Sequence, residues 1–354
     1  MFYLFITIIF RLSIGSKITT YKTDQIEYYV FHLDEDKANP SNLLISDGCS
    51  IKSIGPKGNE LITGKATVLG YQEGALKLAR YGYITSFYQL PNSPQELVIV
   101  DYENHCLRYI QRKGNNFSRP FVGQCQIAGF SDDKGKEQFS HPYALIAKRN
   151  DPNTVIITDW GNSAIREVNV KSATSKTLIQ SSNLNGPRGL AQDSKTGDLF
   201  VTTDFDVYRF SMSSKSLLLL AGTTKTGFKD GDFSGTMFHY IRGIAQLNEW
   251  QLAVTDGFNF RVRVLDMLTN TTTSICTGVK GTKDSADLKK CTMDDPQDVA
   301  VIDGKLMIAE HKNIRVVEGM CHSVISSPQR VLPQKVLFLV VKFFVLTFQK
   351  LHTA

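Results

Sequence analysis

One short pattern recurs along the chain: an apolar run that ends in an acidic residue, a polar turn, and a second apolar run that carries a basic residue. In three complete copies, Asn follows the acid by three positions and Arg follows it by seven: Asp101 with Asn104 and Arg108, Asp159 with Asn162 and Arg166, and Asp256 with Asn259 and Arg263. In three shorter copies the turn is trimmed by two residues: Asp47 with Lys52, Asp204 with Arg209, and Glu310 with Arg315. Successive acids lie 45 to 58 positions apart, and self-similarity at such a period indicates a repeat array or a propeller.

Further β-like runs flank each copy. In the third unit the runs "YALIAKR", "NTVIITD", "AIREVNV" and "SKTLIQS" are separated by turn-forming residues. Four antiparallel strands in each of six units predict an all-β fold, a six-bladed β-propeller of four-stranded antiparallel blades. Radial repetition makes one domain of residues 20–327, a segment that is large for one ordinary core.

The motifs resemble the NHL repeat. The resemblance rests on "FSHPYALI" with "ITDWGNSAIREV", on "NGPRGLAQD" with "LFVTTD", and on "YIRGIAQL" with "LAVTDGFNFRVRV". It covers residues 20–325 and implies the same six-bladed propeller. The turns of the first, fourth and sixth units depart from the full motif, which leaves the bounds of those blades open.

The acidic and basic residues of the pattern are interpreted as scaffold. A catalytic group is needed once, whereas this set occurs six times. The acid ends the second strand of a blade and the base lies on the third, so the two can meet across a hairpin or reach a neighbouring blade. Such a cross-strand pair is expected to contribute about 0.2–1 kcal/mol.

The N-terminus predicts export. Residues 1–15, "MFYLFITIIFRLSIG", read as a signal peptide that ends in a small-x-small cleavage pattern. No basic residue precedes the apolar run and Arg11 interrupts it, so a degenerate first strand is the alternative. The expected location is secreted, or on the extracellular cell surface.

Six cysteines agree with export, because their positions predict disulfides. Cys106 and Cys125 are placed on neighbouring strands, and Cys276 and Cys291 bracket the link between the fifth and sixth blades. Each pair closes a short loop worth roughly 3 kcal/mol. Cys49 and Cys321 fall on the first and last blades, where a disulfide could close the ring; whether they pair is left open. Buried thiols of a cytosolic propeller are the alternative.

Two further features bear on the compartment. Asn116 in "NFS" and Asn270 in "NTT" are glycosylation sequons in loops between the third and fourth strands. The C-terminal tail, residues 328–354, holds a thirteen-residue apolar run that is too short to span a bilayer and is split by Lys342. It faintly resembles a lipid-anchor signal but ends in polar residues, so a buried segment, or a tail outside the folded protein, fits better than membrane anchorage.

Charge argues against nucleic acid as a partner. The net charge is +6, but one excess positive charge lies in the leader and four lie in the tail, at Arg330, Lys335, Lys342 and Lys350. The propeller itself is nearly neutral, so it lacks the basic footprint of a phosphate binder. RNA binding, which some NHL propellers perform, is a minor alternative.

Enzymatic readings have weaker support. Common hydrolase and nucleotide-binding motifs are absent from the sequence. The resemblance includes the peptidylglycine amidating lyase, whose propeller holds zinc with three histidines. Four histidines are expected on one face of this propeller and are the zinc candidates: His105, His141, His239 and His311. The metal motif of that family is not matched residue by residue, so no cofactor is expected. A calcium-dependent propeller hydrolase is a second alternative, but no cluster of acidic residues outside the repeat stands out as a calcium site.

The expected ligand site is the mouth of the central channel. At the start of the innermost strands, four repeat-equivalent positions carry Tyr143, Arg188, Arg242 and Gln297. Two adjacent guanidiniums suit a carboxylate or sulfate, which predicts an anion-binding mouth. The alternative pairs each Arg with an acid such as Asp230, Asp232 or Asp193. The sequence thus predicts a non-enzymatic extracellular binding or scaffold propeller whose top-face loops bind a protein, a peptide or an anionic glycan.

Overall fold

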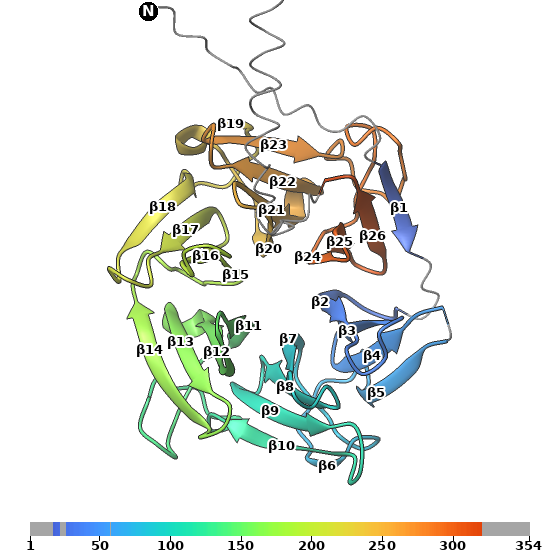
Figure 1. Cartoon of the computed structure of the whole chain (residues 1–354), viewed down its shortest axis with the longest axis vertical. Coiled ribbons are helices and arrows are strands. Elements are labelled where there is room, and N and C mark those ends of the chain that lie inside the picture. Colours follow the sequence, from blue (N-terminus) through green and yellow to red (C-terminus); the bar gives the residue numbers. More distant parts are fainter. Residues whose placement is uncertain (1–16, 22–25, 57, 321–354) are drawn as a thin grey trace, which may run out of the picture. The chain divides into compact units, whose positions relative to one another are not determined.

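The computed structural model describes residues 17–21, 26–56 and 58–320. These residues form six antiparallel sheets, the blades, arranged around a central axis (Figure 1). The predicted all-β, six-bladed propeller is confirmed. In the described residues the only helices are three short 3-10 turns: η1 (Trp160–Asn162), η2 (Phe233–Gly235) and η3 (Gly257–Asn259). No helix of this part of the chain is long and apolar enough to cross a membrane.

The first three blades follow chain order from the axis outward. Blade one is β2 (Val30–Glu35), β3 (Leu43–Asp47), β4 (Ser50–Ile54) and β5 (Glu60–Gly64). Blade two is β7 (Ile84–Gln89), β8 (Glu96–Asp101), β9 (Cys106–Gln111) and β10 (Phe117–Val122), with β6 (Gly74–Ala75) added at its outer edge. Blade three is β11 (Pro142–Lys148), β12 (Asp151–Asp159), β13 (Ala164–Asn169) and β14 (Thr174–Gln180).

The last three blades complete the ring. Blade four is β15 (Leu190–Gln192), β16 (Leu199–Thr202), β17 (Asp206–Phe210) and β18 (Leu217–Gly222). Blade five is β20 (Ile241–Asn248), β21 (Gln251–Asp256), β22 (Arg261–Asp266) and β23 (Thr271–Ile275), with β19 (Gly231–Asp232) at its outer edge. Blade six is β24 (Asp298–Ile302), β25 (Lys305–Ala309), β26 (Ile314–Glu318) and β1 (Lys17–Tyr21).

Blade six takes its outer strand from the start of the chain. β1 pairs with β26 along its whole length, from Lys17 opposite Glu318 to Tyr21 opposite Ile314. The carboxylate of Asp284 accepts hydrogen bonds from both the backbone N–H and the hydroxyl of Thr20. The two ends of the propeller are thus joined by backbone pairing. The proposed signal peptide and C-terminal tail lie outside the described residues.

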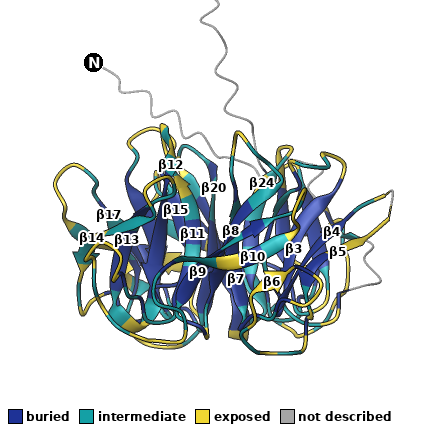
Figure 2. Ribbon diagram, turned by 90° about the horizontal axis from the view of Figure 1, so that it is seen from below, coloured by how far each residue is buried: buried dark blue, intermediate teal, exposed yellow. Residues whose placement is uncertain are grey.

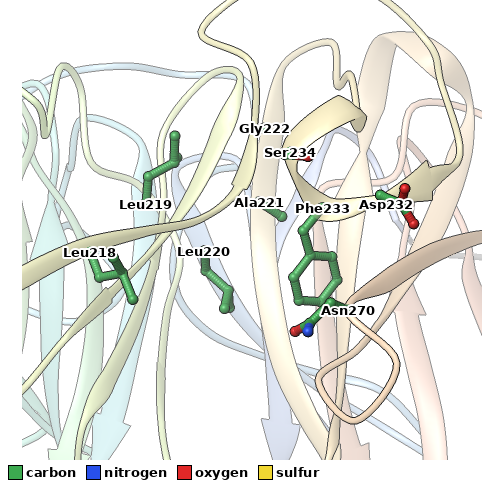
Figure 3. A pocket seen from close by; sticks show the side chains of 9 residues that line it. All are labelled: Leu218, Leu219, Leu220, Ala221, Gly222, Asp232, Phe233, Ser234 and Asn270. Atoms are coloured by element: carbon green, nitrogen blue, oxygen red, sulfur yellow. The ribbon is translucent and has the colours of Figure 1, made fainter.

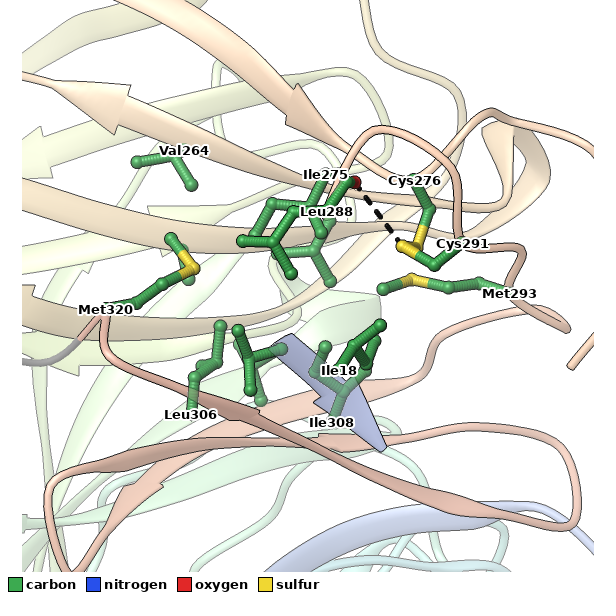
Figure 4. Close-up of a cluster of buried hydrophobic side chains, with 14 of the residues drawn as sticks. Ile18, Val264, Ile275, Cys276, Leu288, Cys291, Met293, Leu306, Ile308 and Met320 are labelled. Carbon is green, nitrogen blue, oxygen red and sulfur yellow. Dashed lines mark hydrogen bonds between the residues drawn. A yellow bond between two sulfur atoms is a disulfide. The ribbon is translucent and has the colours of Figure 1, made fainter. Parts of the chain in front are cut away.

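The hydrophobic core is divided among the interfaces between neighbouring blades, and the strands are mostly buried (Figure 2). The interface between blades five and six includes Ile18 of β1, Val264, Ile308 and the disulfide of Cys276 with Cys291 (Figure 4). Each fully buried aliphatic side chain contributes about 1.5–3 kcal/mol relative to exposure. The small strand β1 therefore carries part of the core that closes the ring.

Both predicted disulfides are confirmed. Cys106 is joined to Cys125, and Cys276 is joined to Cys291. Cys125 lies beyond the end of β10, in the link to blade three, and not on the fourth strand as the sequence predicted. Cys49 is a free, buried thiol whose pKa is raised to about 12, chiefly by burial. Cys321 lies outside the described residues.

In blade three the repeated polar set joins the blade to the link that precedes it. The carboxylate of Asp159 accepts hydrogen bonds from the backbone N–H of Ser140, from the Asn162 amide and from the Arg166 guanidinium, at 2.7, 2.8 and 2.9 Å. Arg166 also donates to the backbone carbonyl of Ser131 in the same link. The side chains of Asp159 and Arg166 are fully buried.

The same set recurs in blades two and five. Asp101 accepts from the backbone of Gly82 and from Arg108, and Asp256 accepts from the backbone of His239 and from Arg263. Because both side chains are buried, removing one partner would leave an uncompensated buried charge. Such a removal is expected to cost about 3–5 kcal/mol, which is a different quantity from the roughly 0.2–1 kcal/mol expected as the net contribution of a pair.

Blade four departs from the predicted pairing. Asp204 does not pair with Arg209; it pairs with Arg188, and Arg209 pairs with Asp198. The register places Val201 opposite Tyr208, so Tyr208 stands where the other blades carry Arg or Lys, and Thr203 stands where they carry the acid. A shift of one residue turns a side chain to the other face of a strand. Asp204 and Arg209 are one position out of register with the repeat.

Candidate functional site

One face of the propeller carries both the links between blades and the turns between second and third strands. Hydrogen bonds join the two kinds of segment, as from the backbone N–H of Gly161 to the carbonyl of Ser140 and from that of Gln126 to the carbonyl of Asn104. This end is the top face. The turns between first and second strands and those between third and fourth strands meet at the bottom face, where the N–H of Met267 donates to the carbonyl of Trp250.

The four predicted site residues lie at the top face in one chain of contacts. Tyr143 is on β11 and Arg242 is on β20, whereas Arg188 and Gln297 precede β15 and β24, which begin later than the sequence predicted. The Arg188 guanidinium lies 5.1 Å from the centre of the Tyr143 ring. Tyr240 lies between the two arginines, with its ring centre 4.6 Å from the Arg188 guanidinium carbon and 4.4 Å from that of Arg242.

Each arginine of the channel mouth has an acidic partner. Arg188 Nε donates to Asp204 at 2.9 Å, and Arg242 Nη1 donates to Asp295 at 2.8 Å. Gln297 completes the chain, because its amide donates to the backbone carbonyl of Asp295. Arg188 and Arg242 are 5% and 9% exposed, so neither presents a free guanidinium fork.

The acidic partners differ from those that the sequence suggested. Asp230 is bound to Arg263, and Asp193 accepts backbone N–H groups of its own turn at Lys195 and Thr196. Asp232 is exposed and lies at the outer edge of blade five. Asp204 lies two residues after the second strand of blade four, and Asp295 lies three residues before the first strand of blade six. Their hydrogen bonds with Arg188 and Arg242 place both at the channel mouth.

Aromatic side chains dominate this region. We call five of them the aromatic arc: Tyr102, Tyr143, Trp160, Tyr240 and Phe258. Tyr102 contacts both Tyr143 and Trp160 edge-on, and the Tyr240 ring stacks on Phe258 with centres 4.8 Å apart. Arg188 joins the two halves, since its guanidinium lies over Tyr143, Trp160 and Tyr240. Phe258 is 48% exposed, so the arc presents apolar surface to solvent.

A second aromatic group lies where blades one, two and six meet. It consists of Tyr28, Tyr29, Phe31, Tyr83 and the imidazole of His311. Tyr28 stacks on Tyr83, and a hydrogen bond between their hydroxyls, together with burial, raises the pKa of Tyr83 to about 12. Burial raises the pKa of Tyr102 in the arc to about 12 as well. These phenols are neutral at physiological pH.

The sequence held a signal for the arc. Tyr102 and Trp160 directly follow the repeated acid, and Tyr143 and Tyr240 flank the start of an inner strand. The buried ion pairs of the repeat do not require any particular residue type at these positions. Their aromatic character in blades two, three and five marks them in the sequence, whereas the charge pattern points only to Tyr143 and its neighbours at the strand starts.

The four zinc candidates do not gather at one point. His105 and His141 touch, and the backbone N–H of His141 donates to His105 Nδ1. His239 packs on Phe258, and His311 packs on Tyr29. Within the described ranges, no group of three or more His, Cys, Asp or Glu side chains could hold a metal ion. These side chains do not fit the three-histidine site that the lyase resemblance implies.

Comparison with known proteins shows the fold. No protein-family model and no curated protein matches the sequence. The structure is similar to an auxiliary nutrient binding protein from Bacteroides ovatus, with a TM-score of 0.63 and 11% identity over 86% of this chain and 76% of that one. It is also similar to a streptogramin B lyase, with a TM-score of 0.53 and 9% identity over 87% and 99% of the two chains.

A third likeness is to a chain in a nidogen/laminin complex, with a TM-score of 0.50 and 12% identity over 75% and 84% of the two chains. At sequence identities of 12% or less, these three structural similarities establish the propeller fold and nothing further. The NHL resemblance stays a prediction of the motifs, and the chain is a six-bladed β-propeller.

Proposed function

We propose that this chain is an exported, non-enzymatic binding propeller that holds a peptide or protein segment against the aromatic arc. The observation that carries the proposal is the arc itself. Four of its five rings lie within about 6 Å of the guanidinium of Arg188 or Arg242, and the charges of both arginines are already paired. Tyr, Trp and Arg provide most of the binding free energy at protein interfaces, because they bury a large area with few rotatable bonds.

The arrangement is prepared for binding before a ligand arrives. Arg188 is held by Asp204, by the Tyr240 hydroxyl and by three aromatic rings. A side chain fixed in this way loses little conformational entropy on binding, and pre-organisation of this kind raises affinity. The paired arginines favour an apolar or aromatic ligand side chain over an anionic glycan, which would have to displace Asp204 or Asp295.

Export is supported by the two disulfides, which form and persist in oxidising compartments. Structural neighbours include proteins named for nutrient binding and for a nidogen/laminin complex, both compatible with a binding role outside the cytosol.

Blade five offers a matched test. Phe258 belongs to the arc on the top face and is 48% exposed, whereas Trp250 lies in a turn at the bottom face and is 43% exposed. Peptides are selected for binding to the full-length protein from a displayed random library, and their affinities are measured for Phe258→Ala and Trp250→Ala. We expect Phe258→Ala to weaken binding by about tenfold or more, since a buried aromatic anchor contributes at least about 1–2 kcal/mol. Trp250→Ala should leave the affinity unchanged.

Two results would count against the proposal. Selected peptides that respond to Trp250→Ala and not to Phe258→Ala would place binding on the bottom face. Failure to select any peptide, with binding instead to a sulfated glycan, would favour the anion-binding mouth.

A further inference from the structure

The two sequons occupy equivalent places in blades two and five, on opposite sides of the ring (Figure 1). Asn116 lies between β9 and β10 and Asn270 lies between β22 and β23; both are exposed, and their φ angles are 46° and 55°. Both backbone carbonyls accept a hydrogen bond from the segment next to the added edge strand, Asn116 from Leu76 and Asn270 from Phe233. Both turns lie at the bottom face, away from the aromatic arc.

Asn270 borders an open apolar groove. The groove has a volume of about 430 Å³ and lies between β18 of blade four and η2 beside blade five (Figure 3). Leu218, Leu219 and Leu220 of β18 line it together with Phe233 and Asn270. We call Leu218 and Leu219 the leucine strip; they are 62% and 43% exposed. They are successive residues of the outermost strand, so their side chains point to its two opposite faces.

The leucine strip is exposed apolar surface, which soluble proteins usually shield from solvent. It lies on the outermost strand of blade four, and exposed apolar residues on an edge strand favour aggregation. The side-chain amide of Asn270 makes no hydrogen bond within the described residues and lies beside the Phe233 ring in the groove (Figure 3). A group attached to that amide would begin at the rim of the groove.

We propose that Asn270 carries an N-linked glycan whose first sugars cover the leucine strip. In the transfer, the Asn270 amide nitrogen forms a bond to C1 of the first sugar of a lipid diphosphate-linked oligosaccharide. The bond between C1 and the diphosphate oxygen breaks, the lipid diphosphate leaves with the electron pair, and the amide nitrogen gives up one proton. No oxidant or reductant is needed. The proposal rests on the export part of the proposed function, but not on the ligand of the arc.

Asn116 provides an internal control. The strand that faces its turn is β5, in which Glu60 and Leu61 take the positions that Leu218 and Leu219 have in β18, because Leu61 pairs with Lys52 as Leu219 pairs with Tyr208. The charged Glu60 replaces an exposed leucine there. Loss of a glycan from Asn116 should therefore expose less apolar surface than loss from Asn270.

The first experiment tests the modification. The full chain is placed behind an added secretory leader and expressed in mammalian secretory cells, so that export does not depend on its own N-terminus. Purified exported protein is treated with peptide N-glycosidase in ¹⁸O-labelled water and analysed by peptide mass spectrometry. We expect labelled Asp at position 270. An unmodified Asn270 in the exported, disulfide-bonded protein would overturn the proposal.

The second experiment tests the cover. Asn270→Asp and Asn116→Asp both suit a left-handed backbone turn, so neither change should disturb the fold. Binding of anilinonaphthalene sulfonate should rise about twofold or more for Asn270→Asp, since exposed leucine side chains are uncovered, and should stay near the parent value for Asn116→Asp. Adding Leu218→Lys to Asn270→Asp should reverse the rise.

Treatment of the folded parent protein with peptide N-glycosidase leaves Asp at position 270, the side chain of the Asn270→Asp variant, in protein that folded with its glycan attached. It should give the same rise. Equal dye binding before and after removal would show that the glycan does not cover the strip. Affinity of the Phe258 surface for its selected peptide should be unchanged in every glycan variant. Failure of the glycan proposal and failure of the proposed function are therefore distinguishable.

Discussion

At the scale of single residues, the buried acid and arginine of the repeat decide stability. Arg166→Met removes a fully buried guanidinium from Asp159 and is expected to lower the free energy of unfolding by about 3–5 kcal/mol. Arg209→Met is the control: its side chain is 36% exposed and its pair with Asp198 is expected to contribute about 1 kcal/mol or less. Urea denaturation measures both changes. Similar losses for the two variants would refute the distinction between scaffold and surface pairs.

A second residue-scale prediction concerns pH. His32 Nδ1 lies 2.8 Å from the Asp298 carboxylate, and the pair joins β2 of blade one to β24 of blade six. Burial lowers the pKa of His32, but the hydrogen bond to Asp298 and the charges of Asp298 and Asp34 outweigh it, so the pKa lies above its usual 6.5. A raised histidine pKa stabilises the folded state fully below the unfolded pKa, and this contribution is lost as pH rises through the folded pKa.

His32→Gln should therefore lower stability more at pH 5.5 than at pH 8.5, values about one to two units either side of the ordinary histidine pKa. Thermal denaturation of the parent and the variant across this range measures the difference. A difference between parent and variant that does not change with pH would mean that His32 is neutral in the folded protein.

At the scale of elements, strand β1 closes the ring. Ile18 is 1% exposed and packs in the core between blades five and six. Ile18→Ala should cost about 2–5 kcal/mol and loosen β1 from β26. Hydrogen exchange should then become faster for the backbone amides of β26 and stay slow for those of β13 in blade three. Equal protection in the two strands would show that closure does not depend on β1.

The sequence predicted the elements best where local rules decide. Alternating apolar residues and turn residues located the blades, and the complete motifs around Asp101, Asp159 and Asp256 placed their hairpins correctly. In blade four the run "VTTD" allows either Thr203 or Asp204 to occupy the acid position of the repeat. Only packing between the strands decides that Thr203 occupies it. Pairing of β1 with β26 joins segments about 300 residues apart, and no local pattern specifies such a contact.

At the scale of the whole molecule, the propeller brings residues from blades two, three and five to one mouth. The repeat positions of Tyr143, Arg188, Arg242 and Gln297 were predictable because the motif recurs in register. Their partners were not, because Asp204, Asp295 and Tyr240 lie in irregular segments whose side-chain directions depend on tertiary packing. The mouth therefore presents an aromatic surface, and its two arginines are bound to acids instead of forming the anion site that the sequence predicted.

The two tryptophans allow a direct measurement of where a ligand binds. Trp160 belongs to the aromatic arc, and Trp250 lies at the bottom face. Trp250→Phe leaves Trp160 as the sole reporter, and Trp160→Phe leaves Trp250. On titration with a peptide selected against the full-length protein, we predict a saturable change of Trp160 emission with no change of Trp250 emission. A change confined to Trp250 would contradict the proposal that this propeller binds through its aromatic arc.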